Sequence, residues 1–78
     1  MNSSILNVAA YRFAGLPDAP ALREAVLARA TAAGLRGTVL LAEEGINLNL
    51  AGEPQALRDF MAWLQQDERL HALPVKES

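Results

Sequence analysis

The side chains that could carry acid–base chemistry or bind a ligand are concentrated in one short stretch, AEEGIN at positions 42–47. Glu43 and Glu44 are neighbouring carboxylates, and paired carboxylates act as general acid and base when they share a site that separates their pKa values. Adjacent strand residues point to opposite faces, so spacing alone does not give these two a common site. Two interpretations stay open: solvated charges at a turn, or contacts to a ligand. Neither predicts catalysis by this pair alone.

A second group of candidates follows in the segment INLNL. Asn47 and Asn49 alternate with apolar residues, which is typical of a strand with one buried and one open face. Asparagine is a poor strand former. Two asparagines on one face therefore indicate either hydrogen bonds to a ligand or another domain, or a solvated surface without further role.

The composition excludes several kinds of site. The chain has no cysteine and one histidine, so it offers no thiolate ligand, no disulfide and almost no ligands for zinc. No metal site and no cofactor are expected in it. A net charge of −2 and a pI near 5.2 argue against DNA as a partner and against an RNA binder that relies on charge alone.

No segment is expected to enter a membrane, because no apolar run approaches the roughly 20 residues that cross a bilayer. The first residues, MNSSILNVAA, lack the basic stretch that begins a signal peptide. The expected localisation is cytoplasmic.

The spacing of apolar residues predicts the order βαββα, with a possible last strand. Strands are predicted at residues 5–13, 37–42 and 46–50, and a short one near 73–76. Asp18 is expected to cap the first helix and Gly34 to end it with a left-handed residue. The buried stripe of this helix is predicted as Leu22, Val26, Leu27, Ala30 and Ala33. The second helix opens at Gly52 and Pro54, and its stripe is Leu57, Phe60, Met61 and Leu64.

The two faces of the first strand give conflicting signals. Asn7 indicates that the odd-numbered face is wet, whereas Tyr11 and Phe13 on the same face indicate burial. The segment 5–13 is interpreted as a largely buried strand.

Glu43, Glu44 and Gly45 are interpreted as a three-residue connection between two strands. The common hairpin of this length is a type I turn followed by a left-handed residue, and glycine is favoured at that last position. The segment EEG thus has a structural explanation as a hairpin tip, and any function is additional to it.

This order matches the ferredoxin-like, split βαβ plan of α+β domains. It predicts an antiparallel sheet with two helices on one face and a fourth strand beside the first. The chain of 78 residues fits a single domain, 1–78. Because the final strand is short or truncated, the chain is interpreted as an N-terminal fragment of a longer protein.

Four arginines are candidates for phosphate contacts, or are solvated charges: Arg12 and Arg36 near strand ends, and Arg58 and Arg69 on the second helix. RNA-binding domains of this topology stack bases on aromatic residues of the central strands. INLNL contains none, which argues against that mode of binding. The loop FAGLPDAP also lacks the glycine-rich, arginine-containing cradle of a working acylphosphatase.

The run LLAEEGINLNLAG follows a strand ending in YRF and precedes a helix, QALRDFMAWLQQDERL. Together these segments resemble the N-terminal domain of a bacterial family, the UPF0176 type of rhodanese-related proteins. The resemblance runs from about Val8 to the end and implies an acylphosphatase-like fold. The residues that match the family signature, and that would contribute to substrate binding or an interface, are Glu43, Glu44, Gly45, Ile46 and Asn47. Asn49 joins them from its place on the predicted open face.

This family is identified with oxygen-dependent tRNA uridine hydroxylases, which place a hydroxyl group on carbon five of the wobble uridine. The resemblance implies tRNA and a downstream rhodanese domain as partners, and molecular oxygen as co-substrate of the parent enzyme. The catalytic cysteine would belong to the rhodanese loop, and this chain has no cysteine. No catalytic residue therefore carries over. The fragment alone would be an accessory domain that positions tRNA or supports the rhodanese domain.

The alternative hypothesis is a non-catalytic binding or interaction module attached to a rhodanese sulfurtransferase. The AEEGIN hairpin would then be an interface, and the partner domain would act in sulfur transfer.

Overall fold

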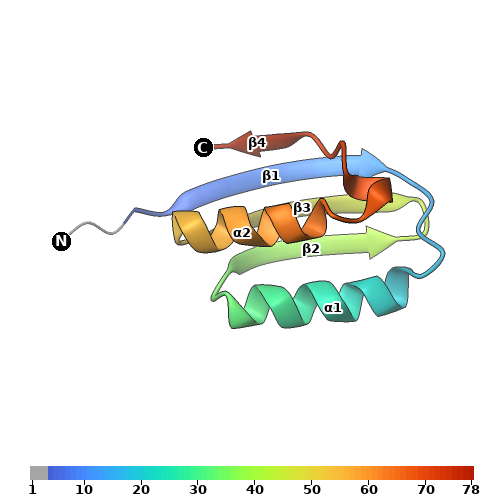
Figure 1. The fold of residues 1–78 in the computed structure, drawn as a ribbon, viewed down its shortest axis with the longest axis horizontal. Coiled ribbons are helices and arrows are strands. Elements are labelled where there is room, and N and C mark those ends of the chain that lie inside the picture. The colour runs from blue at the N-terminus through green and yellow to red at the C-terminus, as the bar shows by residue number, and fades with distance from the viewer. Residues whose placement is uncertain (1–3) are drawn as a thin grey trace.

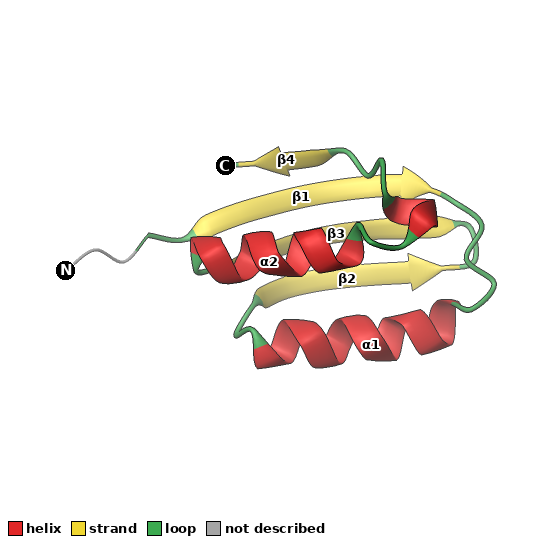
Figure 2. Ribbon diagram, in the orientation of Figure 1, coloured by secondary structure: helices red, strands yellow, loops and turns green. Residues whose placement is uncertain are grey.

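A computed structural model describes residues 4–78 and arranges them as two helices on one face of a four-stranded sheet (Figure 1, Figure 2). The elements are β1 Leu6–Phe13, α1 Ala19–Ala32, β2 Arg36–Ala42, β3 Gly45–Gly52, α2 Pro54–Leu64, the 3-10 turn η1 Glu68–Leu70 and β4 Val75–Glu77. The sheet order is β2-β3-β1-β4, and all neighbouring strands are antiparallel. The predicted split βαβ plan is confirmed, and the short fourth strand lies beside the first as expected.

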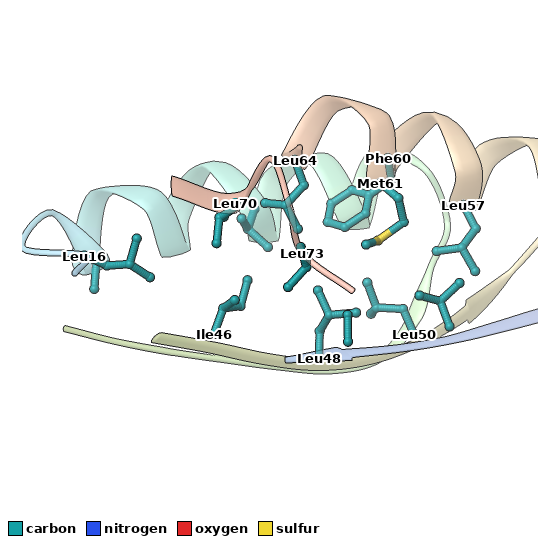
Figure 3. Packing of buried hydrophobic residues seen from close by; sticks show 14 residues of the cluster. Leu16, Ile46, Leu48, Leu50, Leu57, Phe60, Met61, Leu64, Leu70 and Leu73 are labelled. Atoms are coloured by element: carbon teal, nitrogen blue, oxygen red, sulfur yellow. The ribbon is translucent and has the colours of Figure 1, made fainter. Parts of the chain in front are cut away.

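The hydrophobic core lies between the sheet and the helices (Figure 3). In β3, Leu48 is fully buried and Ile46 and Leu50 are nearly so, while Asn47 and Asn49 are exposed, as the alternation of strand side chains predicts. The facing stripe of α2 is buried as predicted: Leu57, Phe60, Met61 and Leu64. β3 and α2 thus supply half of the buried apolar residues that hold the layers together.

The two helices begin in different ways. The Glu53 carboxylate accepts a hydrogen bond from the Ala56 backbone N–H at 2.9 Å and so caps α2. Asp18 precedes α1, but its side chain caps no backbone N–H. The prediction that Asp18 caps the first helix is therefore wrong. Its carboxylate binds the guanidinium group of Arg69 instead.

Gly34 ends α1 as predicted. It has a φ of +70°, and the N–H groups of Gly34 and Leu35 donate to the carbonyls of Thr31 and Ala30, both at 3.0 Å, which is the Schellman arrangement. Leu27 is 65% exposed, so its predicted place in the buried stripe is wrong. Successive helical residues are about 100° apart around the axis, and α1 lies beside the edge strand β2 (Figure 1), so its buried stripe is narrow.

β1 is buried on one face only. Val8 and Ala10 point into the core, whereas the Tyr11 and Phe13 side chains are 61% and 79% exposed. The prediction of a largely buried strand is therefore wrong for the odd-numbered face, and the exposed Asn7 carried the right signal. Both helices lie on the other side of the sheet (Figure 3).

Arg69 ties the segment after α2 to the start of α1. It lies in η1 and not on the second helix as predicted. Its guanidinium binds Asp18 and also donates to the Asp67 carboxylate at 2.8 and 2.6 Å. These hydrogen bonds lower the pKa of both carboxyls and raise the pKa of Arg69.

Arg58 makes a second ion pair, to Glu77 of β4, at 3.3 Å. The guanidinium groups of Arg58 and Arg69 are therefore both bound to carboxylates. Among the arginines proposed for phosphate contacts, this leaves Arg12 and Arg36 as the better candidates, because a paired guanidinium would have to give up its carboxylate first.

Trp63 lies at the edge of the core, between the two helices. Its ring is 5.8 Å from the ring of Phe60, and the guanidinium carbon of Arg29 lies 4.7 Å above its centroid. One face of the indole is thus covered by a cation from α1. The residue links the helices and does not present a free ring.

Candidate functional site

The hairpin tip is shorter than the sequence predicts. Glu43 and Glu44 form the turn, and Gly45 is already the first residue of β3, paired with Ala42. The connection has two residues and not three. Gly45 has a φ of 159°, which is close to extended and is not the left-handed conformation expected of it. The predicted turn type is therefore wrong.

Gly45 is needed for a different reason, which is the close approach of β1. It is the Cα partner of Phe13, and a Cβ atom at this position would lie 2.3 Å from the Arg12 carbonyl oxygen. Two heavy atoms cannot come this close without a shift of the backbone. Glycine therefore allows the hairpin to pack against the end of β1.

The carbonyl groups of the same turn anchor the loop between β1 and α1. The backbone N–H groups of Ala14 and Leu16 donate to the carbonyl oxygens of Glu44 and Glu43, at 3.0 and 2.8 Å. Both glutamates are exposed. Within residues 4–78, no three His, Cys, Asp or Glu residues lie close enough together to hold a metal ion. Contact of this carboxylate pair with a ligand stays a prediction.

Asn47 and Asn49 lie on the uncovered face of the sheet, which we call the open face. Strand alternation and the cross-strand register place the following residues on it: Asn7, Ala9, Tyr11 and Phe13 of β1, Arg36, Thr38, Leu40 and Ala42 of β2, Gly45, Asn47, Asn49 and Ala51 of β3, and Lys76 of β4. Asn47 is the Cα partner of both Tyr11 and Leu40. The two predicted asparagines therefore lie in a surface to which every strand contributes.

The matching segment AEEGIN does not form one continuous patch. Glu43 and Glu44 lie at the tip, and Ile46 points into the core with 3% exposure. Asn47 faces the other way. Of the predicted residues, the structure brings Gly45, Asn47 and Asn49 together on the open face.

Sequence reasoning missed the two aromatic residues of this surface. Tyr11 and Phe13 contact each other edge to face, with ring centroids 6.1 Å apart and planes at 89°. The segment INLNL of β3 has no aromatic residue, and these rings come from β1 instead. The signal that could have identified them is Asn7. It lies on the same face of the strand as Tyr11 and Phe13, and a polar residue there indicates that this face is exposed.

A hollow of about 520 Å³ surrounds this end of the hairpin, and its lining comes from both faces of the sheet. On the open face Tyr11, Phe13 and Asn47 contribute, and on the helix side Arg12 and Arg23 do. The Arg12 Nε atom is buried and has no hydrogen-bond partner among the described residues. Arg12 is thus a second, separate candidate for binding an anion.

The helices that the structure describes are all too short or too polar to cross a membrane.

Comparison with known proteins places the chain in a family. Residues 5–78 match the family described as the UPF0176 acylphosphatase-like domain. A protein of Variovorax paradoxus named tRNA uridine(34) hydroxylase is 57% identical over 95% of this chain, which corresponds to 28% of that protein. Proteins of the same name from Bordetella avium and Delftia acidovorans are 55% and 53% identical over 96% and 97% of the chain, or 31% and 29% of their own length.

The chain therefore spans about three tenths of the length of these curated relatives. The family match, in contrast, covers the chain from Ile5 to its last residue, and it agrees with the observed βαββαβ order. The chain belongs to the UPF0176 acylphosphatase-like domain family.

Proposed function

We propose that this chain is the N-terminal, accessory domain of an enzyme that hydroxylates uridine 34 of tRNA, and that it positions the tRNA for a reaction in another domain. The observation that carries this proposal is the identity of 57% over 95% of the chain with a relative named tRNA uridine(34) hydroxylase. At such identity two domains share their fold. The role of the domain is therefore expected to be the same in both proteins.

The distribution of functional groups supports an accessory role. The chain has no cysteine, its adjacent glutamates lie at a solvated turn, and the side chains on the open face are amides, rings and cations. These groups are suited to binding and not to covalent or acid–base catalysis. The reacting groups are assigned to a downstream rhodanese domain with a cysteine in its loop, with molecular oxygen as co-substrate and carbon five of the uridine as the site of hydroxylation.

The test is complementation. A bacterial strain that lacks its own uridine 34 hydroxylase would receive the complete gene that encodes this chain, and its tRNA nucleosides would be analysed by mass spectrometry. We expect 5-hydroxyuridine or its derivatives to reappear. A matched strain that expresses residues 1–78 alone is expected to remain unmodified. If the complete gene restores no hydroxylation, the proposed function is wrong. The appearance of thiolated uridine instead would favour the sulfurtransferase alternative.

A further inference from the structure

The two aromatic rings of the open face are unusually accessible. Tyr11 and Phe13 are 61% and 79% exposed, and their perpendicular contact leaves further ring surface free. The Cα partner of Phe13 on β3 is Gly45, which has no side chain to cover the phenyl ring. A flat ligand can therefore lie against Phe13 without displacing any side chain of β3.

Polar groups accompany these rings along the same rows of the sheet. Asn47 lies between Tyr11 and Leu40, and Asn49 lies between Ala9 and Thr38. An asparagine amide offers both donors and an acceptor, which is what the edge of a nucleobase requires. Rings that stack bases, with amides beside them that bind base edges, are the usual means by which sheet surfaces recognise single-stranded RNA.

The charges of the chain are separated between the two sides of the sheet. The open face carries Arg36 and Lys76. All nine acidic residues of the sequence lie in the part of the chain that the structure describes, and none occupies a strand position on this face. Glu44 of the turn lines the same hollow as Tyr11, Phe13 and Asn47. Glu77 is the Cα partner of Val8 and points to the helix side, where it binds Arg58. The net charge of −2 therefore does not describe the open face.

The two cations lie at different distances from the rings. Arg36 is in the row of Asn7, which is six positions along β1 from Phe13, or about 20 Å at the usual rise of a strand. Lys76 is the Cα partner of Ala9, so it lies one row from Tyr11. Glu43 and Glu44 lie beyond the Phe13 end. Phosphates are therefore favoured toward Arg36 and Lys76, and bases toward the rings.

We propose that the open face binds unpaired nucleotides of RNA, with bases stacked on Tyr11 and Phe13, amide contacts from Asn47, and phosphate contacts from Arg36 and Lys76. This inference rests on the proposed function, because tRNA is the RNA that such an enzyme would present. It assigns the contact to the sheet surface and not to the glutamates of the hairpin tip.

A protein partner fits this face less well. The centres of protein interfaces are depleted of charge and enriched in aromatic residues, so the rings alone do not distinguish a protein partner from RNA. Here the apolar Leu40 and the aromatic Tyr11 are separated by Asn47, whose amide a protein would have to satisfy after excluding water. A base edge satisfies that amide directly.

The first experiment is an NMR titration of the 78-residue chain with an anticodon stem-loop that has uridine at position 34. The control RNA is a blunt duplex with the sequence of the same stem. We expect shifts of the Tyr11 and Phe13 ring signals and of the Asn47 side-chain amide with the stem-loop, and none with the duplex. Shifts confined to α1, α2 or the glutamates would overturn the inference. This measurement requires no variant.

Variants then test the individual contacts. Tyr11→Leu and Phe13→Leu should each weaken binding by about 5- to 150-fold, the usual effect of losing one stacked base. Arg36→Gln should reduce the slope of log affinity against log salt by about 0.7, because one phosphate contact is lost. Leu27→Ala, at an exposed apolar position on α1, is the matched control and should change neither value. Unchanged affinity of both ring variants would overturn the inference.

Complementation separates failure of this inference from failure of the proposed function. The complete gene with both Tyr11→Leu and Phe13→Leu is compared with the unaltered gene in the strain described above. If the altered and the unaltered gene restore hydroxylation equally, the proposal that bases stack on Tyr11 and Phe13 is wrong, and the proposed function stands. If the unaltered gene restores none, the proposed function falls, and the titration alone decides on the open face. Binding of a purified downstream domain to this face in place of RNA would also overturn the inference.

Discussion

The two faces of one sheet are used in opposite ways. On the helix side, Leu48 of β3 is completely buried, whereas on the open face Phe13 of the neighbouring strand β1 is 79% exposed. Both residues belong to regular central strands of the sheet. Both positions are paired with a neighbouring strand, and the difference in exposure lies in what covers the side chains. One face supplies the free energy of folding, and the other is available for a ligand.

Large effects are expected on the covered face, for example at Leu48 at its centre. Leu48→Ala should lower the free energy of unfolding by about 2–5 kcal/mol, because it removes buried methyl groups and leaves a cavity. Asn49→Ala, the next residue on the opposite face, should change it by less than about 0.5 kcal/mol. Urea unfolding followed by circular dichroism measures both. Equal losses of stability in the two variants would mean that the open face is covered in solution. The contrast between the two faces of the sheet would then be wrong.

Gly45→Ala should have the next largest effect, about 1–3 kcal/mol, because the added Cβ would force the hairpin away from β1. The clash is with backbone, the Arg12 carbonyl oxygen at 2.3 Å, so no side-chain rotation can relieve it. Gly15→Ala is the matched control, since a Cβ there meets nothing within 4 Å. Thermal unfolding of the two variants should give clearly different midpoints. Similar midpoints would show that the tip is not held against β1.

Acid should weaken the helix side through the ion pairs of Arg69. Hydrogen bonds from Arg69 lower the pKa of Asp18 and Asp67 below the usual 3.8. The unfolded chain therefore binds more protons than the folded one in this range, so stability is fully present above about pH 4 and is lost as the pH falls through the lowered values.

The measurement is the free energy of unfolding between pH 6 and pH 2.5, for the unaltered chain and for Arg69→Met. Without the guanidinium the two carboxyls return toward their ordinary pKa, so the variant should lose less stability across this interval. Parallel curves would contradict a role for these pairs, which are largely exposed and therefore contribute little each.

The arrangement of elements was predictable because it rests on patterns that extend over many residues. The stripe of α2 repeats with the helical period, and INLNL alternates with the strand period. Gly34 is the residue type most often found at a left-handed helix end. Each of these signals is reinforced by its neighbours in sequence. Leu27 failed as a prediction because the width of a buried stripe depends on where the helix crosses the sheet, which is a tertiary property.

Predictions about single polar contacts were less successful. Asp18 has the right type and position for a cap, but Arg69, which is 51 residues away, provides a stronger partner. Gly45 was assigned to a turn conformation, whereas the close approach of β1 explains it. In both cases the deciding partner is distant in sequence, and local spacing contains no information about it.

The open face was misread for a related reason. Aromatic residues are more often buried than exposed, so Tyr11 and Phe13 outweighed the polar Asn7 in the reading of β1. A ligand-binding surface is a place where this general preference fails, because ring surface is kept accessible there at some cost in solubility. When polar and aromatic residues alternate onto the same face of a predicted strand, as Asn7, Tyr11 and Phe13 do, the disagreement itself indicates a surface that could bind a ligand.

The smallest expected effect is at Phe13, and Phe60 provides the comparison with a buried residue of the same type. Phe60 of α2 is 3% exposed and Phe13 is 79% exposed. Phe60→Ala should cost about 3–5 kcal/mol, because a buried ring is lost. Phe13→Thr, which keeps a good strand former, should change stability by less than about 0.5 kcal/mol, since Gly45 opposite it makes no side-chain contact and the edge contact to Tyr11 is solvated. Urea unfolding of both variants decides. A loss above about 1.5 kcal/mol for Phe13→Thr would exceed the usual range at exposed sites. It would mean that the ring is needed for folding, and the exposure of the ring would then no longer be evidence for a ligand-binding surface.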